Sequence, residues 1–229
     1  EDYDLIISVG YMLADATRAA AEANPDQKFA IIDDASIDLP NVTCLMFEQA
    51  QATYLVGVVA GMTTESNTVG FVLGMENATM NEFGYGYVAG VLDANPDAKV
   101  LQINANDFGD PAIGKSSAVT MITEGADIIF HAAGGTGRGV IEACVENDIY
   151  AIGVDSDQNS LGPDHVITSA MKRVDVATYD VAKDCLEGKL EGGIRVYDLT
   201  TGGVDIAPTT NLLTEDVVKE IEDIKKKII

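Results

Sequence analysis

The stretch DIIFHAAGGTGRGVIEACVENDIYAIGVDSDQ, residues 127–158, decides the fold class. Its two apolar runs, Asp127–His131 and Tyr150–Val154, are short, continuous and bounded by turn residues, as is typical of strands covered on both faces. Between them, Arg138–Asn147 has the apolar spacing of a helix. A strand, a helix and a second strand in this order predict an α/β fold built on a parallel sheet.

The same alternation continues through most of the chain. The predicted strands are Asp4–Val9, Phe29–Ile32, Val42–Phe47, Thr68–Leu73, Lys99–Ile103, Asp127–His131, Tyr150–Val154 and Val166–Ser169. The predicted helices are Met12–Asn24, Gln49–Thr63, Met80–Asn95, Ala112–Gly125, Arg138–Asn147, Val174–Gly188 and a tail helix, Glu215–Ile229. Asn-Pro-Asp at residues 24–26 and again at 95–97 marks turns between a helix and the next strand, because proline cannot continue the helix.

Composition restricts the class of partner. The chain has 229 residues, with 14 Lys+Arg against 37 Asp+Glu, which gives a formal net charge of −23. Such a charge repels phosphates, so it argues against nucleic acid and against anionic membrane surfaces. Hydrophobic residues make up 47%, enough for a packed core, and no apolar run reaches the roughly 18 residues of a membrane span. The length predicts one large domain or two small ones.

Candidate site residues lie directly after the predicted strands, because ligands of open α/β sheets bind beyond the carboxyl ends of the strands. These positions hold carboxylates, glycines, the aromatic Phe108 and Lys172. The loop GGTGRG, residues 134–139, lacks the spacing of a phosphate loop and of a dinucleotide fingerprint, so we interpret it as a loop whose backbone approaches a ligand closely. Together they favour a neutral, hydroxylated ligand in a cleft between two lobes.

Metal and catalytic sites are not expected. His131 and His165 are the two histidines, and neither has a cysteine or histidine at ligand spacing. Asp155 and Asp157 lack the twelve-position pattern of a calcium loop, and no Gly-x-Ser-x-Gly elbow occurs. We therefore predict no metal ligand, no cofactor and no catalytic residue. An aspartate at a strand end can also simply cap the next helix.

Four stretches resemble one known family. They are NDFGDPAIGK (106–115), GADIIFHAAGGTGRGVIEA (125–143), YAIGVDSDQ (150–158) and VITSAMKRVDVA (166–177), and they resemble the basic membrane protein family of purine nucleoside receptor lipoproteins. The resemblance implies a type I periplasmic-binding fold with two doubly wound parallel-sheet lobes. It also implies an extracytoplasmic protein, lipid-anchored or periplasmic, that delivers nucleosides to the permease of an ABC transporter and catalyses nothing.

The resemblance also implies ligand contacts for a purine nucleoside of the adenosine, guanosine and inosine class. Phe108 matches the aromatic residue that stacks on the base, and Gly134 lies in the loop whose backbone approaches the ligand. Asp155 matches the residue that accepts the ribose hydroxyls, and Lys172 the one that helps to fix the sugar. Asp33 matches a ligand contact of the first lobe. Asp157 is the alternative to Asp155 for the ribose hydroxyls. Two rival functions are a nucleoside-sensing regulatory domain and a nucleosidase that uses one of these two aspartates.

The predicted lobes are residues 1–66, 67–171 and a return segment, 172–229, which completes the first lobe through strands Ile194–Leu199 and Val204–Ala207. The polar segment Thr63–Thr68 is the predicted crossing. The opening EDYDLIISVGYMLADA resembles the third strand–helix unit of the family, so we expect roughly 60 residues of the first lobe to be absent from this chain. Weak nucleoside binding and an open sheet edge that allows self-association would follow.

Overall fold

The computed structural model describes residues 3–228. Positions 1 and 2 of the predicted first lobe and position 229 of the predicted tail helix lie outside the described residues. The chain divides into two compact units. Unit 1 is Glu1–Glu48 with Arg173–Gly203, and unit 2 is Gln49–Lys172 with Val204–Ile229. The chain therefore passes between the units three times, after Glu48, after Lys172 and after Gly203.

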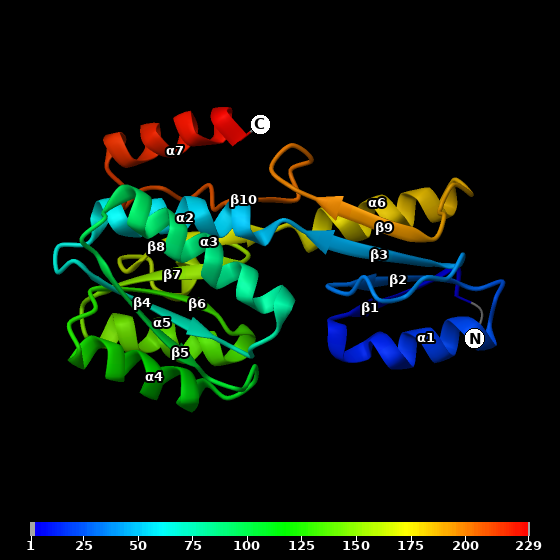
Figure 1. The fold of residues 1–229 in the computed structure, drawn as a ribbon, viewed down its shortest axis with the longest axis horizontal. Helices are drawn as coiled ribbons and strands as arrows, with labels where there is room; N and C mark the ends of the chain where they lie inside the picture. Colours follow the sequence, from blue (N-terminus) through cyan, green and yellow to red (C-terminus); the bar gives the residue numbers. More distant parts are fainter. Residues whose placement is uncertain (1–2, 229) are drawn as a thin grey trace. The chain divides into compact units, whose positions relative to one another are not determined.

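Unit 1 is a small parallel sheet with a helix on each face. The strand order is β1-β2-β3-β9, with bounds Leu5–Val9, Lys28–Ile32, Val42–Phe47 and Gly193–Tyr197. Helix α1 (Ala14–Ala23) lies on one face and α6 (Val174–Leu186) on the other (Figure 1). The inner strands β2 and β3 are almost wholly buried, which explains why their sequences are continuous apolar runs.

Unit 2 is a three-layer α/β unit. Its sheet has the order β10-β8-β7-β6-β4-β5 and is parallel except for β10, which runs antiparallel to β8. The strands are β4 (Thr68–Leu73), β5 (Lys99–Asn104), β6 (Ile128–Ala132), β7 (Tyr150–Asp155), β8 (Val166–Lys172) and β10 (Val204–Ile206). The helices are α2 (Gln49–Thr63), α3 (Ala78–Ala94), α4 (Pro111–Thr123), α5 (Gly137–Glu146) and α7 (Glu215–Ile228).

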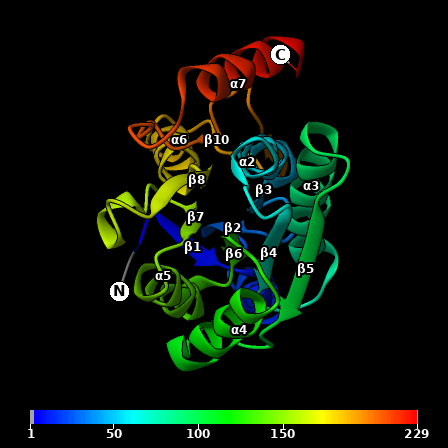
Figure 2. The same ribbon diagram turned by 90° about the vertical axis from the view of Figure 1, so that its left-hand side faces the viewer.

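Seen along the strands, α2 and α3 lie on one side of this sheet and α4 and α5 on the other (Figure 2). An aromatic cluster packs beneath α3, where the ring of Phe130 lies 5.2 Å from that of Phe71 and 5.0 Å from that of Tyr87. Helices α2 and α3 touch through backbone, because a Cβ added at Gly90 would lie 2.0 Å from the carbonyl oxygen of Tyr54. None of the helices described for residues 3–228 has both the length and the apolar character that a membrane crossing requires.

The observed division differs from the predicted lobes 1–66, 67–171 and 172–229. Thr63–Thr68 is not a crossing: it joins α2 to β4, and both belong to unit 2. This segment is polar because its backbone is exposed and ordered by Asp127, whose Oδ2 accepts N–H groups from Glu65 and Ser66 at 2.7 Å each. The crossing lies at Glu48 instead, where β3 leads into α2.

The return segment also differs in part. The late strand β9 joins unit 1, as predicted, by pairing with β3. The prediction for Val204–Ala207 was wrong, because β10 pairs with Ala170–Lys172 of β8 in unit 2. A three-residue strand satisfies the backbone groups at the edge of β8, and its short apolar pattern does not specify which sheet it joins.

Candidate ligand-binding site

The strand order of unit 2 reverses at β4, which has β5 on one side and β6 on the other. In open α/β sheets, ligands bind in the crevice beyond the carboxyl ends of the strands at such a reversal. The loops that follow β4, β5 and β6 meet at this point. All but one of the candidate site residues belong to unit 2.

Phe108 lies at this reversal, in the loop after β5. Its ring packs so closely on Gly74, the residue after β4, that a Cβ added there would lie 2.3 Å from Phe108 Cε1. The same added Cβ would lie 3.1 Å from the Cα atom of Ala133, which follows β6. The Phe108 ring therefore packs directly against the backbone at position 74, where only glycine leaves room for it. Phe108 is only partly buried, so part of this residue stays accessible at the strand ends.

The Phe108 loop is fixed by hydrogen bonds to the loop after β6. Asp107 Oδ1 accepts the N–H groups of Gly109 and Asp110 at 2.6 and 2.7 Å, and these bonds lower the pKa of Asp107. Thr136 donates its hydroxyl to the same oxygen at 3.3 Å and its N–H to the carbonyl oxygen of Phe108 at 3.2 Å. The two loops therefore hold Phe108 as one piece.

Gly134 is exposed at the start of a 3₁₀ turn, Gly134–Thr136, that leads into α5. Its φ of 53° lies in the left-handed region, where glycine is favoured. Gly114 and Lys115, in the neighbouring helix α4, serve helix packing instead. A Cβ at Gly114 would lie 1.9 Å from the carbonyl oxygen of Thr136, and Lys115 pairs with two glutamates of α5 at 2.9 and 2.8 Å.

Asp155 and Asp157 have different surroundings. Asp155 is the exposed last residue of β7 and has a φ of 66°, at the centre of a tight turn closed by Ser156 N–H to the carbonyl oxygen of Val154 at 2.8 Å. Asp157 uses both carboxylate oxygens within unit 2: Oδ1 accepts the N–H of Asn159 at 3.0 Å, and Oδ2 accepts the hydroxyl of Thr209. Asp155 is thus the aspartate at the surface of the strand ends.

Lys172 and Asp33 lie in different units. Lys172 is the last residue of β8, is 8% exposed, and places Nζ 5.7 Å from the centroid of the Phe83 ring. Asp33 follows β2 in unit 1, with a φ of 66° and its N–H donated to Leu45 O at 3.0 Å. The structure thus places Phe108, Gly134, Asp155 and Lys172 at the carboxyl ends of one sheet, with Asp33 at the corresponding end of the other.

Sequence reasoning missed the supporting residues. Gly74 stands at a strand end, but its role depends on Phe108 lying above it, which spacing along the chain does not show. Thr136 and Gln158 also follow predicted strands, within the quoted family stretches, but their position along the chain does not show what they contact. Among residues 3–228, no group of three or more His, Cys, Asp or Glu side chains is placed to hold a metal ion.

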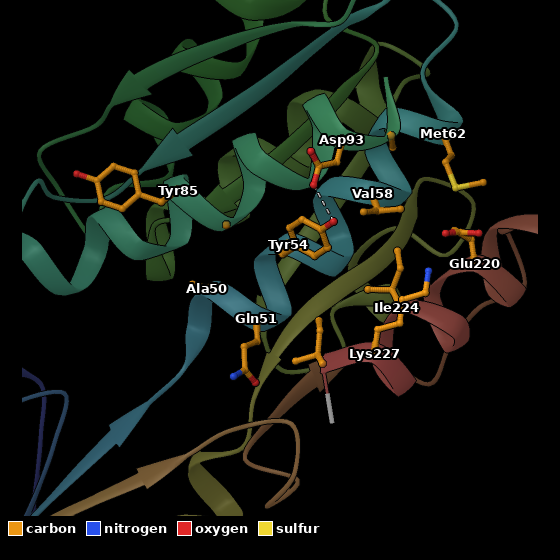
Figure 3. Close-up of a pocket in the computed structure, with 13 residues that line it drawn as sticks. Ala50, Gln51, Tyr54, Val58, Met62, Tyr85, Asp93, Glu220, Ile224 and Lys227 are labelled. Carbon is orange, nitrogen blue, oxygen red and sulfur yellow. Dashed lines mark hydrogen bonds between the residues drawn. The ribbon is translucent and has the colours of Figure 1, made fainter. Parts of the chain in front are cut away.

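A groove of about 910 Å³ lies away from the strand ends, between α2, α3 and α7 (Figure 3). Its lining includes Tyr54, Val58, Met62 and Ile224, and Tyr54 donates its hydroxyl to Asp93 Oδ2 at 2.9 Å. No residue of the strand-end loops lines it. We therefore do not assign the ligand to this groove.

Comparison with known proteins identifies the family. A family profile described as "ABC transporter substrate-binding protein PnrA-like" matches residues 1–229. The chain belongs to this family. Its members are substrate-binding proteins of ABC transporters and not enzymes, as the sequence predicted.

Relatives and solved structures agree with this membership. The chain is 38% identical to a CD4+ T-cell-stimulating antigen of Listeria innocua, over 100% of the chain and 69% of the relative. It is 36% identical to "ABC transporter nucleoside-binding protein BmpA" of Lactococcus lactis, over 98% of the chain and 70% of the relative. A solute-binding protein structure from Aeropyrum pernix matches with a TM-score of 0.91 and 28% identity, covering 99% of this chain and 75% of that one.

A second solved structure, described as a transcriptional activator of the comK gene from Bacillus halodurans, has a TM-score of 0.88 and 26% identity, covering 97% of this chain and 77% of that one. The solute-binding neighbours confirm the predicted α/β fold of the periplasmic-binding type with parallel-sheet lobes.

Proposed function

We propose that this protein binds a purine nucleoside and presents it to an ABC importer. The observation that carries the proposal is the ring of Phe108, held over Gly74 at the strand-order reversal of unit 2, with exposed Asp155 at the end of β7. A planar ring with an accessible surface suits a base, and a carboxylate suits paired hydroxyls. The nucleoside-binding relative from Lactococcus lactis supports the same class of ligand.

Each remaining candidate has a role that its position supports. Base stacking on Phe108 contributes about 1–3 kcal/mol. The exposed backbone of Gly134 approaches the ligand beside the ring, and Lys172 adds a cation at the end of β8, next to β7. Asp33, after β2 of unit 1, stays a predicted ligand contact that the family resemblance implies. We favour Asp155 over Asp157 for the ribose, because Asp155 is exposed at the end of β7, whereas Asp157 is partly buried and holds the backbone of Asn159 and the hydroxyl of Thr209.

The test is calorimetric titration of the full-length gene product with inosine, guanosine and adenosine, using hypoxanthine and ribose as partial ligands. We expect the nucleosides to bind more tightly than either partial ligand, because they alone offer both a base and a sugar. Failure of all three nucleosides to bind would refute the proposal. Free base released from inosine, detected by chromatography, would instead support the nucleosidase rival.

The importer role and location also belong to the proposal. Family membership supports an extracytoplasmic protein with an ABC permease as partner, and lipid anchoring stays a prediction. The likeness to the comK activator favours the sensor alternative. A gene neighbourhood that encodes a permease and an ATPase would support transport, whereas a DNA-binding segment in the same gene product would support the sensor.

Self-association through unit 1 is the remaining partner proposal. Among the described strands, β1 is hydrogen-bonded to β2 alone, and its Val9 is 63% exposed. A strand with unpaired backbone groups can pair with another chain. Sedimentation velocity of this chain over a range of concentrations tests the proposal, and a monomer at every concentration would contradict it.

A further inference from the structure

A buried histidine lies behind the Asp155 turn. His131, on β6, is fully buried, and its Nε2 lies 3.0 Å from Oε1 of Gln158 in the loop after β7. The same Oε1 accepts the backbone N–H of Val154 at 3.0 Å. Because an N–H donor fixes this end of the amide as the oxygen, and an amide oxygen can only accept, Nε2 of His131 carries the proton.

Glycines make room for this arrangement. A Cβ added at Gly137, the first residue of α5, would lie 2.0 Å from Nδ1 of His131. A Cβ added at Gly153 would lie 2.6 Å from Gln158 Oε1 and 2.5 Å from Ser169 Oγ. Ser169 in turn accepts the N–H of Gln158 at 3.1 Å. The ring and the amide therefore lie between close neighbours, which restricts both to one position.

Burial keeps this histidine neutral, and the surroundings of its second nitrogen agree with a neutral ring. Among the described residues, Nδ1 of His131 has no hydrogen-bond partner. It faces the first residue of α5, and the N–H groups at a helix N-terminus carry partial positive charge, which disfavours a second proton. Burial lowers the pKa of His131 to about 4. The ring thus donates one fixed hydrogen bond, to Gln158.

The hydrogen bond from His131 holds the Gln158 amide, and this amide in turn fixes the backbone next to Asp155. Val154 precedes Asp155, and both of its polar backbone groups are held: its N–H by Gln158 and its carbonyl oxygen by Ser156 N–H at 2.8 Å. Asp155 itself has a φ of 66°, a conformation that a residue other than glycine adopts at a cost. Holding both groups of the preceding residue keeps the turn in this conformation.

We propose that His131 and Gln158 are positioning residues that fix the Asp155 turn for the sugar of the ligand. The inference rests on the proposed function, because it requires Asp155 to contact the ribose. Neither residue touches the ligand. Their effect is therefore expected on nucleosides, which carry a ribose, and not on the free base, which stacks on Phe108 alone.

The test uses near-isosteric pairs in the full-length gene product. Gln158→Met removes the acceptor, His131→Met removes the donor, and His131→Gln returns an N–H group near the position of Nε2. We expect both methionine variants to bind inosine about tenfold more weakly, with hypoxanthine changed by less than about twofold. His131→Gln should recover most of the lost affinity.

A double-mutant cycle separates positioning from general damage. In an Asp155→Ala background, Gln158→Met should cost no further inosine affinity, because the group that it positions is gone. A loss that persists in this background, or equal losses for inosine and hypoxanthine, would overturn the inference while leaving the proposed function standing. If wild-type protein binds no nucleoside, the proposed function fails, and this inference fails with it.

A spectroscopic measurement keeps the inference testable where a variant does not fold. Nitrogen–proton correlation spectra of the wild-type imidazoles should show His131 with its proton on Nε2 and with Nδ1 unprotonated at neutral pH. The Val154 amide should be protected from hydrogen exchange in wild type and exposed in Gln158→Met. A proton on Nδ1, or an unprotected Val154 amide in wild type, would overturn the inference.

Discussion

Replacing Phe108 tests the base-binding half of the site most directly. The ring is partly buried on Gly74, so the change must separate lost stacking from lost packing. Phe108→Leu keeps an apolar side chain over the glycine but has no aromatic face, and Phe108→Tyr keeps the face. A stack worth about 1–3 kcal/mol corresponds to roughly a 5- to 140-fold change in Kd at 1.4 kcal/mol per decade.

We therefore expect Phe108→Leu and Phe108→Ala to weaken adenosine, guanosine and inosine by that factor, and by similar factors for all three. Stacking depends little on base substituents, which is why the losses should match. Truncation to alanine adds a packing loss, which for a fully buried phenylalanine is about 3–5 kcal/mol and is smaller for this partly exposed ring.

Calorimetry gives the affinities, and urea unfolding gives the stability change of each variant. Phe108→Tyr, the matched control, should bind all three nucleosides nearly as well as wild type. The reasoning is refuted if Phe108→Leu binds as tightly as wild type, or if the three nucleosides lose affinity by clearly different factors. Either result would move the base away from the Phe108 ring.

Three further changes test other parts of the site and fold. Asp155→Ala should weaken inosine at least about tenfold and hypoxanthine little, whereas Asp157→Ala should lower stability more than affinity; titration with both ligands decides. Gly74→Ala should displace the Phe108 ring and weaken every purine nucleoside in calorimetry, since the added Cβ would lie 2.3 Å from it. For His131, the pKa in the folded state is about 4, below the ordinary 6.5. Between these two pH values the unfolded chain therefore binds a proton at this histidine that the folded chain does not bind. The stability that the neutral His131 contributes is fully present above pH 6.5, and the free energy of unfolding falls by up to about 1.4 kcal/mol per pH unit as the pH is lowered to 4. The urea midpoint of His131→Gln, measured over the same pH range, should lack this part of the pH dependence.

The strands could be predicted because burial on both faces leaves a continuous apolar run. Every residue of β6 is buried, and the predicted Asp127–His131 differs from it by one residue at each end. The crossing at Glu48 could not be found in this way, because Phe47-Glu48-Gln49 contains neither glycine nor proline. A chain can pass between units without any break in the local sequence pattern. A polar loop such as Thr63–Thr68 indicates only that the segment is exposed, not that it joins two units.

For the candidate site, too, the sequence predicts positions that follow from the order of the elements but not contacts that depend on the fold. The strand-end rule selected Phe108, Gly134 and Asp155, because this rule depends on the order of elements along the chain. The rule also covers Gln158, but it does not predict the contact between Gln158 and His131, which joins residues 27 positions apart and depends on the pairing of β6 with β7. The sequence alone offered a histidine in an apolar strand, with no indication of its partner.

The three passages of the chain between units have a consequence for biosynthesis. Strand β8 ends at Lys172, but its edge partner β10 begins at Val204, after the chain has passed through α6 and β9 of unit 1. During translation, the edge of β8 that β10 later covers is therefore left unpaired while those residues are made. Unpaired edges are where nascent chains aggregate. The sheet of unit 2 is therefore complete only when β10 has been made, after the whole segment of unit 1 between them, rather than when the first 172 residues have emerged.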